Sequence, residues 1–220
     1  TLATPRGKVV GGSSSINGLI FVRDQSQDYD RWAQAGNPGW TWREVLPYFK
    51  KSERYQGGAN EYHGGDGELD VSDLRNDHPY CQAWLQAGVE AGFPRSADFN
   101  GAQPSGLGAY QLTLRGHWRC DAGKAFLDPA MARPNLSIRT YVQVTRVLIE
   151  QGRAVGVELI ENGQRSQVRA GSEVLLAAGA LQSPQLLQLS GIGPAQLLQS
   201  HGIDVQVDAK EVGENLQDHY

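Results

Sequence analysis

The spacing of hydrophobic and polar residues predicts helices in the first half of the chain. Residues 14–22 follow a pair of glycines and place Ile16, Leu19 and Ile20 where a short helix would bury them. Ser26 has the residue type and position of an N-cap for a second helix, in which aromatic side chains fall at helical spacing. We therefore expect two short helices joined by a turn at the start of the chain.

Two further helices are predicted from capping signals and apolar stripes. Residues 41–44, Thr-Trp-Arg-Glu, form a capping box, in which the first and last residues each bond to the backbone N–H of the other. Pro47 lies inside this helix and should remove one hydrogen bond. Residues 79–92 have an amphipathic pattern that places Trp84 and Leu85 on the inward face.

The segments between these helices are expected to be irregular. Residues 55–67 are rich in Gly, Tyr and Asn and predict an exposed loop, whereas 94–122 is long enough to be a lid or a binding loop. The histidines show no metal-ligand spacing, so we expect surface or turn positions and no metal site; they are His63, His78, His117, His201 and His219. Cys81 and Cys120 form no CxxC motif; two buried thiols are favoured over a disulfide or a ligand pair.

From residue 135 onward the pattern has the period of two that is typical of strands. The predicted strands are 137–140, 142–150, 154–161 and 164–170. Asn162-Gly163 is a strong hairpin signal between the last two. The apolar run 173–177 predicts a buried parallel strand, and Ser183-Pro184 predicts the N-cap and first residue of the next helix. The chain as a whole is expected to be a mixed α/β protein.

Composition and charge narrow the classes of function. The chain has 220 residues and a formal net charge of −4 at pH 7. This charge argues against a nucleic-acid partner, since proteins that bind nucleic acid usually carry a basic face. No apolar run approaches the length of a membrane span. The chain begins at Thr1 rather than at a methionine, which raises the question of whether it is a whole protein.

The glycine- and serine-rich segment 6–18, RGKVVGGSSSING, carries the main chemical signal. Glycines let the backbone approach a ligand that a Cβ would hold away. Hydroxyls and free N–H groups at the start of a helix suit a phosphate or another anion. Considered alone, however, this segment is equally compatible with a plain glycine-rich entry to a helix.

Two segments together resemble the glucose–methanol–choline family of flavin oxidoreductases. They are 7–30, GKVVGGSSSINGLIFVRDQSQDYD, and 179–193, GALQSPQLLQLSGIG. The ending VGENLQDH at 212–219 has the matching order and spacing. Residues 38–53 and 125–140 look most like the bacterial choline-dehydrogenase-type alcohol dehydrogenases of this family, and the resemblance runs along essentially the whole chain.

The resemblance implies part of an FAD-binding Rossmann-like domain together with part of a substrate cap domain. Residues 1–54 would be an FAD-binding segment, 55–134 the cap region with its loops, and 135–220 a segment of the FAD-binding sheet. The cofactor contacts it implies are Gly11, Gly12 and Ser13 along the pyrophosphate and ribityl region, Asn17, Gly18 and Ile20 along the inner edge of the flavin, and Val144 against the adenine. Some relatives attach FAD through a histidine just before the asparagine; Ile16 stands there, so noncovalent FAD is expected.

The resemblance also indicates what this chain lacks. The strand and G-x-G-x-x-G turn that begin such FAD sites do not occur in it, and the Gly-Leu-Gly at 106–108 follows no strand. The family's catalytic histidine lies nearer the C-terminus of the parent, so no catalytic residue is assigned here. Relatives often have Arg-Cys-Ser or Arg-Ser-Ser at 119–121, and Asp121 departs from that pattern.

The activity that the resemblance implies is oxidation of choline or another primary alcohol to an aldehyde, by hydride transfer to flavin N5. Electrons would pass to a quinone, another carrier or O₂, in the cytoplasm or at the periphery of the inner membrane of a bacterium. Two alternatives remain open: a hydroxynitrile-lyase-type relative in which FAD is structural, and a non-catalytic fragment.

Overall fold

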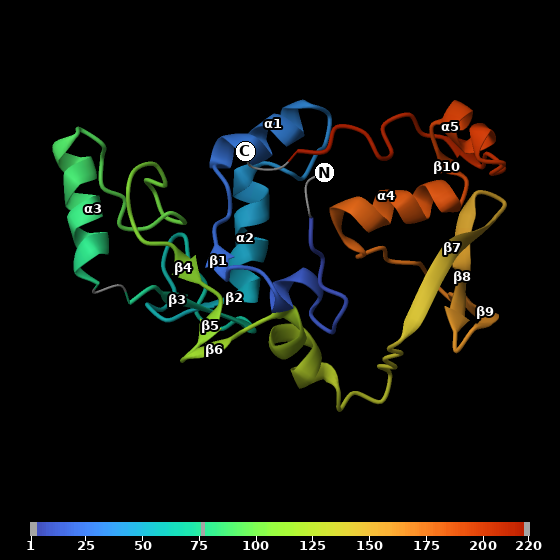
Figure 1. Ribbon diagram of the computed structural model, residues 1–220, viewed down its shortest axis with the longest axis horizontal. Coiled ribbons are helices and arrows are strands. Elements are labelled where there is room, and N and C mark those ends of the chain that lie inside the picture. The colour runs from blue at the N-terminus through green and yellow to red at the C-terminus, as the bar shows by residue number, and fades with distance from the viewer. Residues whose placement is uncertain (1–3, 76–77, 218–220) are drawn as a thin grey trace. The chain divides into compact units, whose positions relative to one another are not determined.

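The computed structural model of the protein describes residues 4–75 and 78–217, and contacts between residues divide it into two compact units, Thr1–Leu136 and Ser137–Tyr220 (Figure 1). Within the described residues, no helix is both long and apolar enough to cross a bilayer. The end of the predicted 212–219 segment, including His219, lies outside the described residues. The predicted mixed α/β fold class is confirmed.

Among its described residues the first unit contains six helical elements, of which the three longest match predicted helices with shifted ends. They are η1 (Gly12–Ser15), α1 (Ser26–Gln34), α2 (Trp42–Ser52), α3 (Pro79–Glu90), η2 (Gly123–Leu127) and η3 (Asp128–Ala130). The capping box of α2 is confirmed, with both Thr41 and Glu44 bonding to the other's backbone. The N-cap of α1 is Gln25 rather than Ser26, because Gln25 forms a capping box with Asp28.

A four-stranded sheet joins distant parts of the first unit. Its strands are β1 (Ile20–Phe21), β2 (Glu53–Tyr55), β3 (Leu69–Asp73) and β4 (Gln111–Leu112), in the order β1-β4-β3-β2. β2 and β3 are parallel, whereas β4 runs antiparallel to both of its neighbours. Strands β5 (Leu114–Arg115) and β6 (Trp118–Arg119) form a separate hairpin. Buried apolar side chains of this unit are Tyr29, Val71, Leu85, Cys120 and Ala125.

Three further predictions for the first unit are wrong. The helix over 14–22 is absent, because the short 3-10 turn η1 is followed by a left-handed residue, Leu19 with φ 68°, and the chain then pairs with β4. Ile16 and Ile20 are consequently 51% and 55% exposed. The segment 55–67 is not simply exposed, since His63 is buried. Trp84 is 63% exposed, and Leu85 is the buried residue of α3.

The second unit is built around an antiparallel meander. It comprises β7 (Val142–Glu150), β8 (Arg153–Glu161) and β9 (Gln164–Arg169), followed by α4 (Gly179–Leu189), β10 (Ile192–Gly193), α5 (Ala195–Ser200) and β11 (Val207–Asp208). The three predicted strands of the meander and their turns are confirmed. Helix α4 lies against β7, where the Val147 N–H donates to Ser190 Oγ at 2.8 Å. Val147, Leu159 and Leu198 are the buried apolar residues.

Three predictions for this unit are corrected. Residues 137–140 and 173–177 are not in strands. A strand is defined by its hydrogen-bonded neighbour, and no described strand pairs with 173–177, where Leu175 is 81% exposed. Helix α4 begins at Gly179, so Ser183 lies inside it; Ser183 Oγ accepts a hydrogen bond from the Ala178 N–H at 3.1 Å.

Candidate cofactor site

The glycine turn owes its shape to two residues with left-handed backbone angles. Gly11 has φ 88° and Gly12 has φ 57°, and the Gly12 N–H closes the turn on the Val9 carbonyl at 2.8 Å. A Cβ on Gly11 would lie 2.4 Å from Ser15 Oγ, so the packing of the turn itself requires glycine there. At Gly12 and Gly18 an added Cβ would meet nothing within 4 Å. These two positions therefore present open backbone.

The three serines mainly hold the turn together. Ser14 Oγ donates to the Gly11 carbonyl at 2.5 Å, and Ser15 Oγ donates to the Val10 carbonyl at 2.9 Å. Ser13 Oγ accepts from the Gly7 N–H at 3.2 Å. A hydroxyl that accepts a bond still has its own proton to donate. Of the three hydroxyl groups, that of Ser13 is thus the best suited to a ligand oxygen.

Asn17 is fixed by its own turn and by a distant arginine. Its Oδ1 accepts hydrogen bonds from the Leu19 N–H at 3.1 Å and from Arg119 Nη1 at 2.7 Å. The Leu19 carbonyl in turn accepts from the Thr113 N–H at 2.9 Å, next to the pairing of Ile20 with Leu112. The segment from Gly11 to Ile20 is therefore anchored on the edge of the sheet.

Six of the seven predicted contact residues lie in one ten-residue segment of the sequence. They are Gly11, Gly12, Ser13, Asn17, Gly18 and Ile20. Val144 belongs to the second unit, on the edge strand β7, where it pairs with Leu159 beside a register shift. Its carbonyl accepts a hydrogen bond from Gln143 Nε2 at 3.0 Å.

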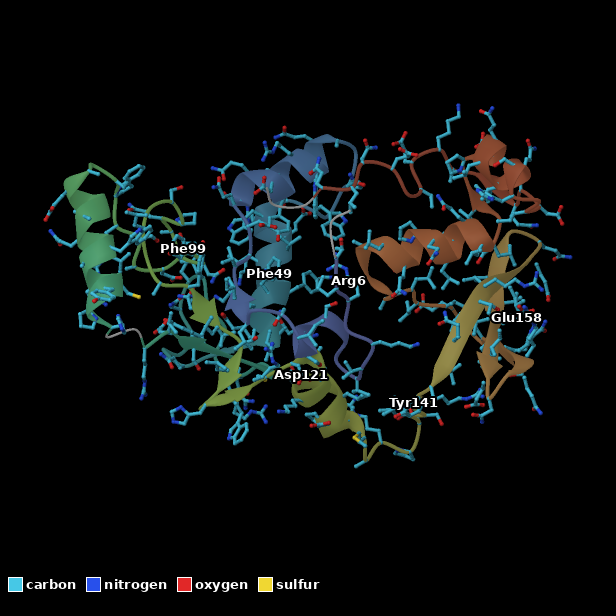
Figure 2. All side chains as sticks on the ribbon, viewed as in Figure 1. Arg6, Phe49, Phe99, Asp121, Tyr141 and Glu158 are labelled. Atoms are coloured by element: carbon cyan, nitrogen blue, oxygen red, sulfur yellow. The ribbon has the colours of Figure 1, made fainter. Side chains whose placement is uncertain are left out.

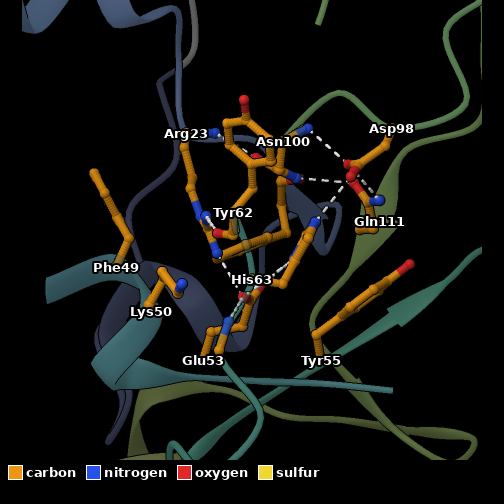
Figure 3. Close-up of polar contacts among 12 residues, drawn as sticks. Arg23, Phe49, Lys50, Glu53, Tyr55, Tyr62, His63, Asp98, Asn100 and Gln111 are labelled. Atoms are coloured by element: carbon orange, nitrogen blue, oxygen red, sulfur yellow. Dashed lines mark hydrogen bonds and ion pairs between the residues drawn. The ribbon is translucent and has the colours of Figure 1, made fainter. Parts of the chain in front are cut away.

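A buried ion cluster in the first unit was not predicted from the sequence (Figure 3). It comprises Arg23, Glu53, His63 and Asp98. His63 places Nδ1 2.9 Å from Glu53 Oε1 and Nε2 3.0 Å from Asp98 Oδ2, so both ring nitrogens face carboxylates. Arg23 Nη2 bonds to Glu53 Oε2 at 2.5 Å. When the His63 imidazole is doubly protonated, the cations Arg23 and His63 balance the anions Glu53 and Asp98.

Hydrogen bonds shift the pKa values of His63 and Asp98 within the buried ion cluster. Burial alone would lower the pKa of His63, but its hydrogen bonds to Glu53 and Asp98 outweigh burial and raise the pKa. Burial would likewise raise the pKa of Asp98, yet hydrogen bonds from His63, Asn100 and Gln111 lower it. His63 is 0% exposed, so the prediction of a surface or turn position is wrong for this residue. No local pattern marks it, because the other members of the cluster, Arg23, Glu53 and Asp98, come from three separate segments.

The cluster is a structural element rather than a catalytic one. Arg23, Glu53 and His63 are each at most 2% exposed, and Tyr55 stacks on the His63 ring at 4.1 Å between centroids. A substrate therefore has no direct approach to the imidazole. Among the described residues, the cluster included, no group of three or more His, Cys, Asp and Glu is arranged to hold a metal ion. Cys120 is buried and Cys81 is half-buried, and both are free thiols.

Comparison with known proteins identifies the family to which the chain belongs. The family model for GMC oxidoreductases matches residues 1–220. The chain therefore belongs to the GMC oxidoreductase family, as the sequence resemblance predicted.

Individual relatives agree with this assignment. The chain is 46% identical to the oxygen-dependent choline dehydrogenase of Rhizobium johnstonii, over 99% of this chain and 40% of that protein. It is 46% identical to the mitochondrial choline dehydrogenase of Mus musculus, over 98% of this chain and 36% of that one. An FAD-dependent oxidoreductase from Chaetomium thermophilum has a similar structure, with a TM-score of 0.87 and 33% identity over 92% of this chain and 38% of its own. The chain thus spans about 40% of the length of the Rhizobium relative.

Proposed function

We propose that these 220 residues form part of an enzyme that oxidises an alcohol to an aldehyde with FAD as its cofactor. The observation that carries the proposal is the open backbone at Gly12 and Gly18, in a chain that belongs to the GMC family. FAD, when bound, supplies a hydride acceptor at flavin N5. The share of this chain is to bind and orient that cofactor.

The residues of the glycine turn fit this cofactor in chemistry. Gly11, Gly12 and Ser13 offer backbone and hydroxyl groups at the start of η1, as an anionic pyrophosphate and a polyol chain require. Asn17, Gly18 and Ile20 follow on the extended part of the segment and would contact the flavin. Val144 would meet the adenine through backbone groups of the edge strand β7, where an apolar side chain is no obstacle.

The FAD is proposed to be noncovalent. The residue directly before Asn17 is Ile16, whose hydrocarbon side chain offers no nucleophile. Denaturing the loaded protein should therefore release all flavin as free FAD in the supernatant. Yellow colour or flavin fluorescence that stays with the precipitated polypeptide would contradict this point.

The substrate is proposed to be choline or another primary alcohol. Its hydroxyl proton would go to the histidine that the family resemblance implies outside these 220 residues; the buried His63 has no access to substrate. Electrons would leave through a quinone or another carrier in preference to O₂, in the cytoplasm or at the inner membrane surface of a bacterium. The two choline dehydrogenases at 46% identity support this choice of substrate class.

Anaerobic mixing of the FAD-loaded, full-length protein with primary alcohols tests the proposal. An oxidoreductase should bleach the visible flavin bands and release one aldehyde per flavin reduced. A flavin that stays oxidised with every alcohol, together with release of cyanide from a cyanohydrin, would instead identify a lyase. Turnover with O₂ equal to that with an artificial acceptor would overturn the preference for a carrier.

A further inference from the structure

Arg119 contacts the candidate cofactor segment from a hundred residues away. It lies on β6, where it pairs with Leu114 of β5, and its side chain is half-buried. Its Nη1 donates to the Ser14 carbonyl at 3.0 Å and to Asn17 Oδ1 at 2.7 Å, and its Nη2 donates to the Asn17 carbonyl at 2.8 Å. One guanidinium thus bonds to three acceptors on two residues, Ser14 and Asn17.

These acceptors are the groups that decide the path of the segment after η1. The last carbonyl groups of a helical turn lack partners within it and carry partial negative charge. Arg119 satisfies the Ser14 carbonyl inside η1 and the Asn17 carbonyl just beyond it. Because the Asn17 side chain also accepts from the Leu19 N–H, the same contact limits the conformations of residues 17–19.

Backbone contacts from the same region reinforce the arrangement. The Ala122 N–H donates to Ser14 Oγ at 2.9 Å, and the Thr113 N–H donates to the Leu19 carbonyl at 2.9 Å. Within 113–122, Arg119 is the residue whose side chain reaches both Ser14 and Asn17. A planar guanidinium is suited to this task, since its fixed fork of N–H donors can bridge several acceptors.

We propose that Arg119 is a positioning residue for the cofactor. It holds the Asn17 carbonyl and side chain in place, and thereby sets how Asn17 and Gly18 meet the flavin. This inference rests on the proposed function, and it adds a residue that is not among the predicted contacts. Arg119 would act through Asn17 and would not itself touch the flavin.

The test compares Arg119→Ala and Arg119→Lys with the wild type in the FAD-loaded protein at its full natural length. The matched control is Arg115→Ala, because Arg115 lies on the same hairpin and its guanidinium bonds to Asp70 rather than to Ser14 or Asn17. The measurements are the dissociation constant for FAD and the visible circular dichroism of the bound flavin. The second reports the geometry around the flavin, which a purely structural role elsewhere would not change.

Arg119→Ala is expected to weaken FAD binding by about tenfold or more, because a charged donor to three acceptors is lost. It is also expected to alter the flavin dichroism. Arg119→Lys should restore part of the affinity but not the wild-type dichroism, since an ammonium cannot reproduce the fork. Arg115→Ala should match the wild type in both measurements.

Wild-type affinity and dichroism in Arg119→Ala would overturn the inference while leaving the proposed function intact. If Arg119→Ala does not fold, Arg119→Lys decides alone, and a wild-type dichroism in that variant overturns the inference. A wild-type protein that binds no FAD would overturn the proposed function and this inference together.

Discussion

Asp121 Oδ1 lies 2.8 Å from the point that a Cβ on Gly11 would occupy. Asp121, labelled in Figure 2, lies two residues before the start of η2. Its Oδ1 accepts a hydrogen bond from the Lys124 N–H at 3.0 Å. The residue that departs from the pattern of its relatives thus forms one wall of the glycine turn. Asp121 leaves no room for a side chain at Gly11, whereas nothing lies within 4 Å of an added Cβ at Gly12.

Gly11→Ala should destabilise the protein more than Gly12→Ala. Both residues have positive φ, and an alanine there costs about 1–2 kcal/mol. At Gly11 the new methyl group would also contact Ser15 Oγ and Asp121, so we expect a further loss of about 1–3 kcal/mol. Urea unfolding of the two variants measures the difference. Equal midpoints would mean that the turn is not packed as described.

Removal of the imidazole from the buried ion cluster should be among the most damaging single changes. His63→Leu would leave the buried Glu53 without its Nδ1 partner and Asp98 without its Nε2 partner. Breaking a buried ion pair on one side typically costs about 3–5 kcal/mol. The matched control is the exposed His201, whose replacement by Ala should change the free energy of unfolding by less than about 0.5 kcal/mol. A small effect of His63→Leu in the same urea titration would refute the assigned ion pairs.

Stability should depend on pH through the same cluster. The pKa of His63 is raised above 6.5 in the folded state, so its contribution is complete below 6.5 and is lost as pH rises through the folded pKa. The pKa of Asp98 is lowered below 3.8, so its contribution is present above 3.8 and is lost as pH falls through the folded value.

The free energy of unfolding should therefore decline on the alkaline side of 6.5 in the wild type. This decline should be much smaller in His63→Gln, which has no titrating ring. Urea midpoints measured across neutral and mildly alkaline pH compare the two proteins. Parallel curves for the two would show that His63 does not titrate as proposed.

Local signals in the sequence predicted those elements whose partners are close in the chain. The β7–β9 meander follows from alternation and from the turn at Asn162-Gly163, and α2 follows from the capping box of Thr41 and Glu44. In each case the residues that determine the structure lie within one turn or one hairpin.

Elements that depend on distant partners were not predictable in this way. Ile20 pairs with Leu112 as part of a strand, so the helix that the apolar pattern of 14–22 predicted does not form. The cluster around His63 depends on Arg23 and Asp98, and the orientation of Asn17 depends on Arg119, 102 residues away. No local pattern encodes such pairs.

If open backbone in the segment 11–20 contacts FAD, the replacement Gly18→Ala should show it. Gly18 has no positive φ, and an added Cβ meets nothing within 4 Å, so this change should leave the free energy of unfolding within about 0.5 kcal/mol of the wild type. Gly171→Ala is the matched control, because that glycine is equally open but belongs to the second unit. The decisive measurement is the dissociation constant for FAD of the full-length protein. We expect Gly18→Ala to lose affinity for FAD by about tenfold or more, because the added methyl group would overlap the bound ligand. Gly171→Ala should lose none. Wild-type affinity in Gly18→Ala would contradict a contact between this backbone and FAD.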